Sequence, residues 1–407
     1  MNKDVKKLLL VNVFLAFADG IFYNFLELWL SNNGMSVNTI STILSLASLI
    51  TVSIIFLSSN IIKQNRLKNF VIILMAIKSI ILSLLFILYQ SNLNILIKFL
   101  VMIEYAIDVE ICASMYPLIS KINKDDKLYA KRKLLYEIIY YIAAIISGLL
   151  LGKSLSNLNI TYNTYAVIGS ISILISAIIL WKTNINKYIK TEKENQNNDI
   201  LFKLIKKIKT DRISNNYLLF IIFNDISYYT LVGILMTILT KELGYSPVTA
   251  SNIKLFFCIL AVAIATLILY KLTSKNNNIN LGIKYIGRII FYLIPAIYPN
   301  KYTIILGLAF TILTSSAYAH ITDAPYINRF DNSEQLAFSN LCNMIGYFCK
   351  AIGTLICGYT LTIGLRYNFI VAFIFTSFCT IFAYRAMHKL TKERSEHKWL
   401  ETHGMKN

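Results

Sequence analysis

Residues 34–41 read Gly34-Met-Ser-Val-Asn-Thr-Ile-Ser41, and residues 244–251 read Gly244-Tyr-Ser-Pro-Val-Thr-Ala-Ser251. The two stretches match at an offset of 210 residues, and each separates two long apolar runs. Self-similarity at a fixed offset is the signature of an internal repeat. We therefore expect two copies of one structural unit, with this turn between the first and second apolar runs of each copy.

Two further matches support the repeat. Pro117-Leu-Ile-Ser-Lys-Ile122 matches Pro325-Tyr-Ile-Asn-Arg-Phe330 at an offset of 208, and Phe17-Ala-Asp19 matches Phe223-Asn-Asp225 when a few gaps are allowed. Each match lies at the equivalent place in its half of the chain. The pattern predicts two six-helix halves in parallel orientation, which is an architecture typical of membrane transporters.

The composition agrees with a chain that is almost entirely membrane-embedded. Of the 407 residues, 56% are hydrophobic and 15% are charged, whereas soluble domains are about 25% charged. An ordinary soluble enzyme is therefore excluded. The formal net charge of +19 would suggest nucleic acid in a soluble protein. In a membrane protein it indicates basic loops that face the cytoplasm, so we expect no nucleic-acid partner.

The apolar windows predict an all-α membrane protein with twelve transmembrane helices. The spans are about 8–30, 37–60, 70–90, 95–119, 134–152, 164–182, 217–240, 248–272, 282–298, 302–325, 336–360 and 368–388. The termini and even-numbered loops hold 27 Lys and Arg residues, and the odd-numbered loops hold four. This asymmetry predicts that both termini are cytoplasmic.

Four regions follow from these spans. They are an N-terminal six-helix bundle (1–183), a cytoplasmic linker (184–216), a C-terminal six-helix bundle (217–390) and a charged cytoplasmic tail (391–407). The linker begins with a charged, amide-rich segment that cannot bury an apolar core. Its second part, residues 201–209, places apolar residues at helical spacing between lysines. That pattern predicts a basic amphipathic helix suited to an anionic inner leaflet.

No metal or cofactor site is evident. The six cysteines lie inside apolar stretches without metal-ligand spacing, and no nucleotide-binding glycine loop or zinc motif occurs. We expect the proton gradient, rather than ATP, to supply the energy.

Topology, length and the repeat together resemble the major facilitator superfamily over essentially the whole chain. The loop between helices two and three in that family usually reads G-x-x-x-D-R-x-G-R-R. Here Asn60-Ile-Ile-Lys63-Gln-Asn-Arg66-Leu-Lys68 keeps the basic residues but lacks the glycines and the aspartate. The resemblance implies two six-helix bundles whose helices 1, 4, 7 and 10 line a central cavity.

Those four helices carry polar and ionisable residues, which are costly in a membrane and therefore candidates for function. The predicted proton-coupling and cavity residues are Asp19, Tyr23, Glu104, Asp108, Asp225, Tyr229, His320 and Asp323. Glu27 and Tyr347 are additional candidates for the same cavity. Deep basic residues lie on other helices, namely Lys78, Lys254, Arg288 and Lys350. We take Arg288 and Lys350 as charge partners.

Two interpretations of these charges are open. In the first, the cavity has excess negative charge, favours cations and offers carboxylates that carry a proton. In the second, the acids pair with the deep bases and only hold helices together, with Asp225 and Lys350 as the leading pair.

One constellation is similar to the proton–sugar symporters of the superfamily, which carry H-x-x-E-x-P on helix ten. This chain has His320-Ile-Thr-Asp323-Ala-Pro325. The resemblance also matches Asp225, Arg288 and Lys350 to charged positions on helices seven, nine and eleven. Helix five lacks the arginine and tryptophan of the sugar symporters. The similarity therefore implies proton coupling rather than sugar.

We expect a proton-coupled secondary transporter, not an enzyme, that works by alternating access and exports a cationic or amphipathic small molecule. The alternative is a proton symporter that imports a polar nutrient such as a sugar. Minor alternatives are a sensor that has lost transport and a polytopic lipid enzyme, although the loops are short for the latter. Frequent Ile, Asn, Lys and Tyr indicate an AT-rich genome. We therefore predict a multi-pass monomer in a bacterial plasma membrane.

Overall fold

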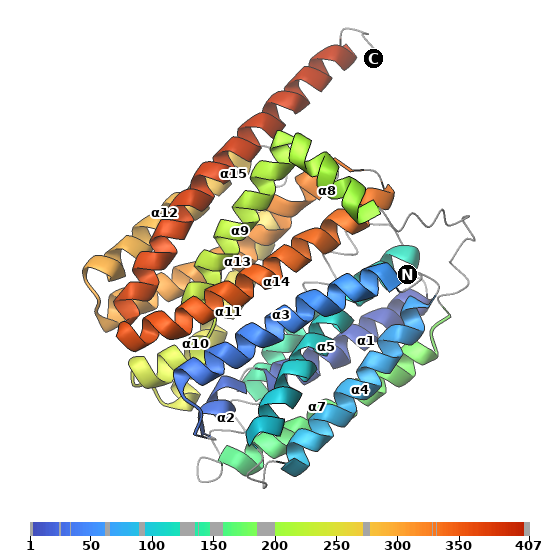
Figure 1. The fold of residues 1–407 in the computed structure, drawn as a ribbon, viewed down its shortest axis with the longest axis vertical. Helices are drawn as coiled ribbons and strands as arrows, with labels where there is room; N and C mark the ends of the chain where they lie inside the picture. Colours follow the sequence, from blue (N-terminus) through green and yellow to red (C-terminus); the bar gives the residue numbers. More distant parts are fainter. Residues whose placement is uncertain are drawn as a thin grey trace.

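The computed structural model is helical throughout the residues that it describes (Figure 1). These are residues 3–23, 26–32, 34–61, 66–88, 94–122, 135–136, 138–146, 158–184, 200–271, 277–327, 329–330 and 332–402.

The first part of the chain forms one group of packed helices. They are α1 (Lys3–Phe22), α2 (Leu26–Asn32), α3 (Val37–Ile61), α4 (Leu67–Leu88), α5 (Asn94–Ile122) and α7 (Leu158–Trp181). Helix α7 packs on α1 and α4, and α5 packs on α3 and α4. Residues 138–146 are also helical, and Tyr140 of this segment lies against Gly20 of α1.

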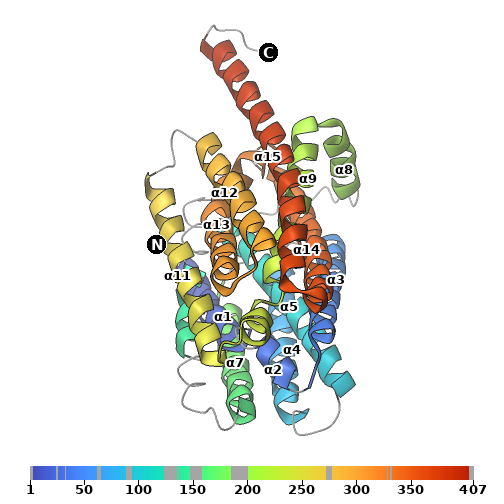
Figure 2. The same ribbon diagram turned by 90° about the vertical axis from the view of Figure 1, so that its left-hand side faces the viewer.

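The second part forms another group, beside the first (Figures 1 and 2). Its elements are α8 (Ile200–Thr210), α9 (Arg212–Val232), α10 (Leu235–Thr237), the π-helical turn η2 (Ile238–Glu242), α11 (Pro247–Lys271), α12 (Asn277–Ile297), α13 (Lys301–Ile327), α14 (Asn332–Ile363) and α15 (Leu365–Thr402). Helix α9 packs between α14 and α15, while α12 contacts α13 and α15. The exact boundaries of the four regions stay a prediction.

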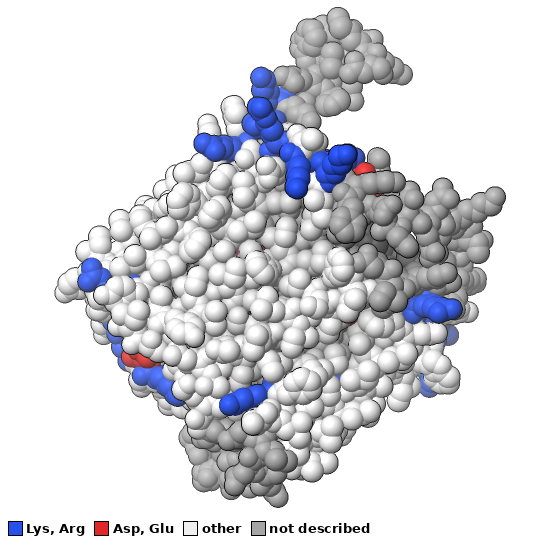
Figure 3. Space-filling view, in the orientation of Figure 1, with Lys and Arg blue, Asp and Glu red and all other residues white. Residues whose placement is uncertain are grey.

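Seven helical segments in the described part of the chain are long and apolar enough to cross a membrane. They are Lys3–Ser31, Val37–Ser58, Leu67–Leu85, Asn163–Trp181, Arg212–Glu242, Asn340–Ile363 and Leu365–Leu390. Helix α5 is long, but it carries Lys98, Glu104, Asp108 and Glu110. On the face shown in Figure 3, charged side chains lie towards the two ends of the helices and the middle is uncharged. The count of twelve spans and the cytoplasmic termini stay predictions.

The repeated turn adopts the same geometry twice. Gly34 and Gly244 both have left-handed backbones, with φ of 76° and 67°. Two residues later a serine hydroxyl accepts the backbone N–H of a threonine at 3.2 Å, in Ser36–Thr39 and again in Ser246–Thr249. A serine cap satisfies an N–H that the first helical turn leaves open. The matched letters of the repeat therefore encode the start of α3 and of α11.

The first long span of the second part is broken. The predicted span 217–240 contains α9, α10 and η2, whereas the predicted span 8–30 contains α1 and α2 with residues 24 and 25 outside the described residues. The break falls at Gly233 and Ile234, where Ile234 leaves the helical region at φ −137° and ψ 51°. Gly233 is needed there because an added Cβ would lie 2.8 Å from Thr354 Oγ1. Broken helices of this kind expose backbone groups that side chains can bind.

Lys68, the last residue of the segment compared with the family motif, lies next to the end of α7. Lys68 Nζ donates to the carbonyls of Trp181 (2.9 Å) and Thr183 (2.7 Å), and Lys7 Nζ donates to that of Lys182 (2.7 Å). Cations at this end of a helix stabilise the carbonyls that have no partner within the helix. Lys63 lies outside the described residues.

Helix α8 confirms the amphipathic helix but corrects its predicted surroundings. Leu204 and Ile208 are buried in a cluster with Tyr217, Tyr326 and other side chains of the second part. The apolar face is therefore covered by protein rather than by the inner leaflet. The reason is that α9 and α14 offer an apolar surface directly beside α8.

Polar contacts at the C-terminal end of α8 hold it in place. Lys207 Nζ lies 2.7 Å from Glu334 Oε2, and Asp211 Oδ2 lies 2.8 Å from Arg329 Nη1. Burial opposes ionisation of Asp211, but hydrogen bonds from Ser214 and Ile213 and the Arg329 guanidinium outweigh it. They hold the pKa of that carboxyl below its usual range.

Helices α3 and α14 form the closest contact between the two parts. Ser45 Oγ donates to the carbonyl of Ala351 at 2.7 Å. A Cβ added at Gly358 would lie 1.9 Å from Ser41 Oγ and 2.4 Å from Ser41 Cβ. Small residues let helix backbones approach closely in membranes, so this crossing depends on Gly358.

We predict that Gly358→Ala lowers the free energy of unfolding by about 1–3 kcal/mol, because the helices must separate to admit the methyl group. The midpoint of thermal unfolding in detergent measures the effect. Gly169→Ala in α7 is the matched control, since its Cβ would meet nothing closer than 3.6 Å. Adding Ser41→Gly to Gly358→Ala should restore stability. A fully stable Gly358→Ala single variant would contradict the close crossing.

Candidate functional site

A buried lysine joins three carboxylates in the first part of the chain. Lys78 Nζ, from α4, lies 2.8 Å from Asp19 Oδ1 of α1 and 3.6 Å from Glu104 Oε1 of α5. It also contacts Asp108 Oδ1, one turn further along α5. The exposed fractions are 1% for Lys78, 2% for Asp19, 0% for Glu104 and 8% for Asp108. We call these four residues the Lys78 cluster.

The cluster exists because three helices bring opposite charges to one depth. An isolated charge at a membrane centre is costly, and the cost falls only when the charges are paired. Asp19, Glu104 and Asp108 point from α1 and α5 towards α4, so Lys78 lies within ion-pair distance of all three. With every group ionised, three negative charges face one positive charge, and the cluster keeps an excess of negative charge.

Two tyrosines complete the cluster. The Tyr23 hydroxyl donates to Glu104 Oε2 at 2.7 Å, and the Lys78 amine lies 5.4 Å from the centre of the Tyr23 ring. The Tyr136 hydroxyl donates to Asp19 Oδ2. Each donor stabilises the ionised form of the carboxylate it contacts. Neutralising any of the three acids therefore changes contacts on several helices at once.

A metal ion does not fit this cluster well. Ligand atoms of Asp19, Asp108 and Cys112 lie within 4.8 Å of one another, which is compatible with coordination. However, the Lys78 ammonium contacts both carboxylates and supplies the positive charge itself. A metal would have to displace it. The prediction of no metal site therefore stands as a prediction.

The second part of the chain holds a separate polar group around Arg288 of α12. Its guanidinium donates to Thr314 Oγ1 (2.8 Å), to Asn224 Oδ1 (2.9 Å) and to the carbonyl of Thr311 (3.4 Å). Asn224 Nδ2 in turn donates to Asp225 Oδ1 at 2.8 Å. Arg288 is thus connected to Asp225 through an amide rather than directly.

Lys350 of α14 lies among tyrosines from both parts of the chain. Its amine donates to the Tyr105 hydroxyl and lies 4.8, 5.0 and 5.8 Å from the ring centres of Tyr105, Tyr229 and Tyr347. The predicted ion pair between Lys350 and Asp225 does not form between these two described side chains. Instead, Asp225 Oδ2 faces the backbone of α14 at Gly346, one turn before Lys350.

The Lys78 cluster and Lys350 are connected through two rings. Tyr23 and Tyr105 pack edge to face with centroids 5.7 Å apart. Tyr23 contacts Lys78 and Tyr105 contacts Lys350. Tyr23, the three tyrosines around Lys350 and Lys350 itself are only partly buried. We call Tyr23, Tyr105, Tyr229 and Tyr347 the tyrosine group.

Glu27 of α2 contacts the second part at the helix break described above. Its Oε2 atom accepts the backbone N–H of Thr237 at 3.1 Å and the Thr237 hydroxyl at 3.3 Å. These donors belong to α10, the short helix that restarts after Gly233. A carboxylate is favoured at the start of a helix, where N–H groups have no partner in the helix. Glu27 therefore ties α2 to α10.

The predicted residues fall into three places. Asp19, Tyr23, Glu104 and Asp108 lie at or beside the Lys78 cluster. Tyr229, Tyr347 and Lys350 lie together, with Asp225 and Arg288 nearby. Glu27 lies apart, at the contact with α10. The side chains of His320 and Asp323 lie outside the described residues, so their similarity to the symporter motif stays a prediction.

Sequence reasoning did not anticipate three contributors. Lys78 was recognised as a deep base but was not placed among the acids, because span order does not tell which faces meet. Tyr105 directly follows Glu104 in the sequence, and the charge of Glu104 was the only sequence feature that could have marked Tyr105 as part of the site. Thr237 contributes through a backbone N–H, which leaves no trace in the sequence.

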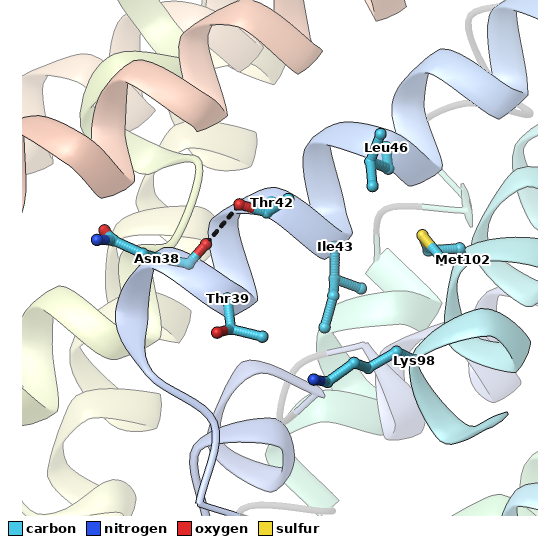
Figure 4. Close-up of a pocket in the computed structure, with 7 residues that line it drawn as sticks. All are labelled: Asn38, Thr39, Thr42, Ile43, Leu46, Lys98 and Met102. Atoms are coloured by element: carbon cyan, nitrogen blue, oxygen red, sulfur yellow. Dashed lines mark hydrogen bonds between the residues drawn. The ribbon is translucent and has the colours of Figure 1, made fainter. Parts of the chain in front are cut away.

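A pocket of about 350 Å³ lies elsewhere, between α3 and α5 (Figure 4). Its lining residues are Asn38, Thr39, Thr42, Ile43, Leu46, Lys98 and Met102. None of them belongs to the Lys78 cluster or to the tyrosine group. The Lys98 side chain reaches towards Thr39 in Figure 4.

Apolar spanning helices, a broken helix and buried ionisable residues define a membrane transporter rather than an enzyme. The family model of the Major Facilitator Superfamily matches residues 8–349. The chain belongs to this superfamily. No curated protein sequence matches it significantly.

Solved structures of transporters share the fold. The nucleoside transporter NupG aligns at a TM-score of 0.63 and 12% identity, covering 95% of this chain and 99% of that chain. A POT family transporter in complex with 5-aminolevulinic acid aligns at 0.67 and 11% identity, covering 95% and 96%. A bacterial homologue of the human lysosomal transporter Spinster aligns at 0.62 and 13% identity, covering 94% and 96%.

We predict that Lys78→Gln lowers the free energy of unfolding by about 3–5 kcal/mol, because it leaves three buried carboxylates without their cation. Lys78→Gln combined with Asp108→Asn should be more stable than Lys78→Gln alone. Thermal unfolding in detergent at neutral pH measures both. If the two losses simply add, the residues do not interact as the structure indicates.

We also predict that Glu27→Ala loosens the contact between α2 and α10. Cys357 is fully buried near Glu27 and is a native reporter. Its labelling by a membrane-impermeant maleimide, mapped by mass spectrometry, should rise about tenfold, since hydrogen bonds to a charged group are lost. Glu242→Ala is the matched control, because Glu242 is exposed in the same segment. Equal labelling in Glu27→Ala and wild type would exclude this role for Glu27.

Proposed function

We propose that the protein is a proton-coupled secondary transporter that works by alternating access. The observation that carries this proposal is the Lys78 cluster, in which three buried carboxylates share one ammonium group. Addition of a proton to one carboxylate removes one partner of Lys78 and rearranges contacts among α1, α4 and α5. Binding of a proton is thereby linked to helix packing.

We assign Glu104 as the residue that binds the transported proton. Its Oε1 atom is buried, lies 3.6 Å from Lys78 and forms no hydrogen bond with the described residues. Asp19 and Asp108 contact the ammonium more closely than Glu104 does. Tyr23 connects Glu104 to Tyr105 and so to Lys350 on α14. These contacts connect Glu104 to the second part of the molecule.

The charge of the cluster favours a substrate with a positively charged group. Three carboxylates against one ammonium leave a negative excess when all are ionised. We therefore propose export of a cationic or amphipathic small molecule in exchange for protons. The proton gradient is the energy source, and a monomer in a bacterial plasma membrane is the proposed state.

Import of a polar nutrient with protons is the second candidate. It is favoured by Lys350, a positive group among tyrosines that suits polar or anionic solutes. Structures with the same fold include transporters whose titles name nucleosides and 5-aminolevulinic acid. Those likenesses concern the fold, so the substrate is decided by experiment.

The test uses purified protein in liposomes that contain a pH-sensitive dye. A proton gradient is imposed and lipophilic cations, sugars and amino acids are added in turn. We predict that Asp19→Asn, Glu104→Gln and Asp108→Asn each reduce substrate-driven proton flux to background. Glu110→Gln should keep the flux of the wild type. Glu110 is a buried acid of the same helix, α5, whose Oε1 accepts from Ser114.

Each outcome has one meaning. Proton efflux on adding a cation indicates antiport and export, while proton entry with a neutral solute indicates symport. Normal flux in all three cluster variants would show that the Lys78 cluster does not carry the proton. Substrate binding without any flux would favour a sensor that has lost transport.

A further inference from the structure

Lys350 differs from the other bases of the predicted cavity in what its amine contacts. Lys78 faces three carboxylates, and Arg288 donates to three oxygens. An ammonium group has three N–H donors. Within the described part of the chain, Lys350 uses one of them on the Tyr105 hydroxyl and otherwise faces rings. It therefore keeps donors for a further acceptor.

The surroundings of Lys350 are built to receive a solute. Tyr105 comes from α5, Tyr229 from α9, and Tyr347 and Lys350 from α14, so both parts of the molecule contribute. These side chains are partly exposed, whereas the Lys78 cluster beside them is fully buried. Tyrosine rings add flat apolar contact and a polar hydroxyl at little entropic cost.

The sign of charge changes across the tyrosine group. On one side, the Lys78 cluster has three acids to one base. On the other side, Lys350 is a cation without an ion-pair partner among the described carboxylates. Two rings, those of Tyr23 and Tyr105, separate the two sides. A solute that spans this group meets a negative region at one end and a positive region at the other.

We propose that Lys350 binds an anionic group of the substrate, a carboxylate, while the Lys78 cluster attracts the substrate's positively charged group, so that the substrate is a zwitterion. This inference rests on the proposed function, because it names the substrate class of the same cavity. A carboxylate would accept hydrogen bonds from the donors of the Lys350 amine that the Tyr105 hydroxyl does not use. Since Tyr105 and Lys350 belong to different parts, the bound substrate then lies at a contact between them.

A purely cationic substrate fits Lys350 less well. Aromatic rings do bind ammonium groups, but here the Lys350 ammonium already lies over the three rings. A second cation would have to expel it against charge repulsion. A carboxylate instead forms charge-assisted hydrogen bonds with the donors that Lys350 keeps.

The test compares probes that differ in one charge. γ-Aminobutyrate, ε-aminocaproate and alanyl-alanine are zwitterions; their methyl esters keep only the amine, and butyrate and caproate keep only the carboxylate. Binding is measured by calorimetry on the full-length protein in nanodiscs. The proposal predicts that at least one zwitterion binds more tightly than both of its single-charge relatives.

Variants then locate the effect. Lys350→Gln should weaken binding of that zwitterion about tenfold or more and leave binding of its ester unchanged, as expected for loss of a charge-assisted contact. Lys350→Arg should stay within a few-fold of the wild type. Lys98→Gln, a lysine of α5 in the pocket of Figure 4, is the matched control and should have no effect.

Several results would overturn the inference. These are wild-type zwitterion affinity in Lys350→Gln, equal binding of ester and zwitterion by the wild type, and tighter ester binding in Lys350→Gln, which would mean that the lysine merely fills the aromatic site. If lipophilic cations drive proton flux but no zwitterion binds, the proposed function stands and this inference fails. If no solute drives flux in the liposome assay, the proposed function fails.

Discussion

The shared contact of three buried carboxylates with one ammonium is the constraint on which the rest of the structure depends. Buried charges inside a membrane protein are costly unless opposite charges lie beside them. Lys78 contacts Asp19, Glu104 and Asp108, and so fixes the relative positions of α1, α4 and α5. A change in the charge of one residue of the Lys78 cluster therefore alters the packing of the other helices.

A second constraint acts where the two parts of the molecule meet. Close approach through Ser41 and Gly358 holds α3 against α14, and Glu27 holds α2 against α10. The two contacts differ in kind. The first is steric and insensitive to charge, while the second depends on a carboxylate and the start of a helix. A rocking motion that keeps the first contact and breaks the second would require little repacking.

Much of the fold could be predicted from the sequence, because apolar length and repeat spacing are local signals. The helices α3, α4, α7, α9 and α15 lie where the apolar windows placed them, and the serine-capped turns at Ser36 and Ser246 coincide with the repeat. The break at Gly233 and Ile234 was not foreseen, since apolar windows average over it. The prediction that the inner leaflet covers the apolar face of α8 was wrong, because amphipathicity does not distinguish lipid from a neighbouring helix.

The site was harder to predict, because pairing across helices depends on rotation about each helix axis. The acids of α1 and α5 were recognised from their type, but the leading ion pair was expected between Asp225 and Lys350, and the sequence did not indicate that Lys78 of α4 contacts Asp19 and Asp108. For Lys350 the sequence indicated only a positive charge deep within a membrane-spanning helix. The tyrosines around it come from three separate helices, and only their packing brings Tyr105 and Tyr229 to one amine.

The two capped turns also bear on the origin of the chain. At Gly34 and Gly244 a left-handed glycine precedes a serine cap with almost the same hydrogen-bond lengths, although the helices that follow have diverged. Lipid-facing positions accept almost any apolar residue, so they drift after a gene is doubled. A left-handed turn that must start a helix accepts few residues. The turn therefore preserves the trace of an ancestral duplication more clearly than the apolar stretches on either side of it.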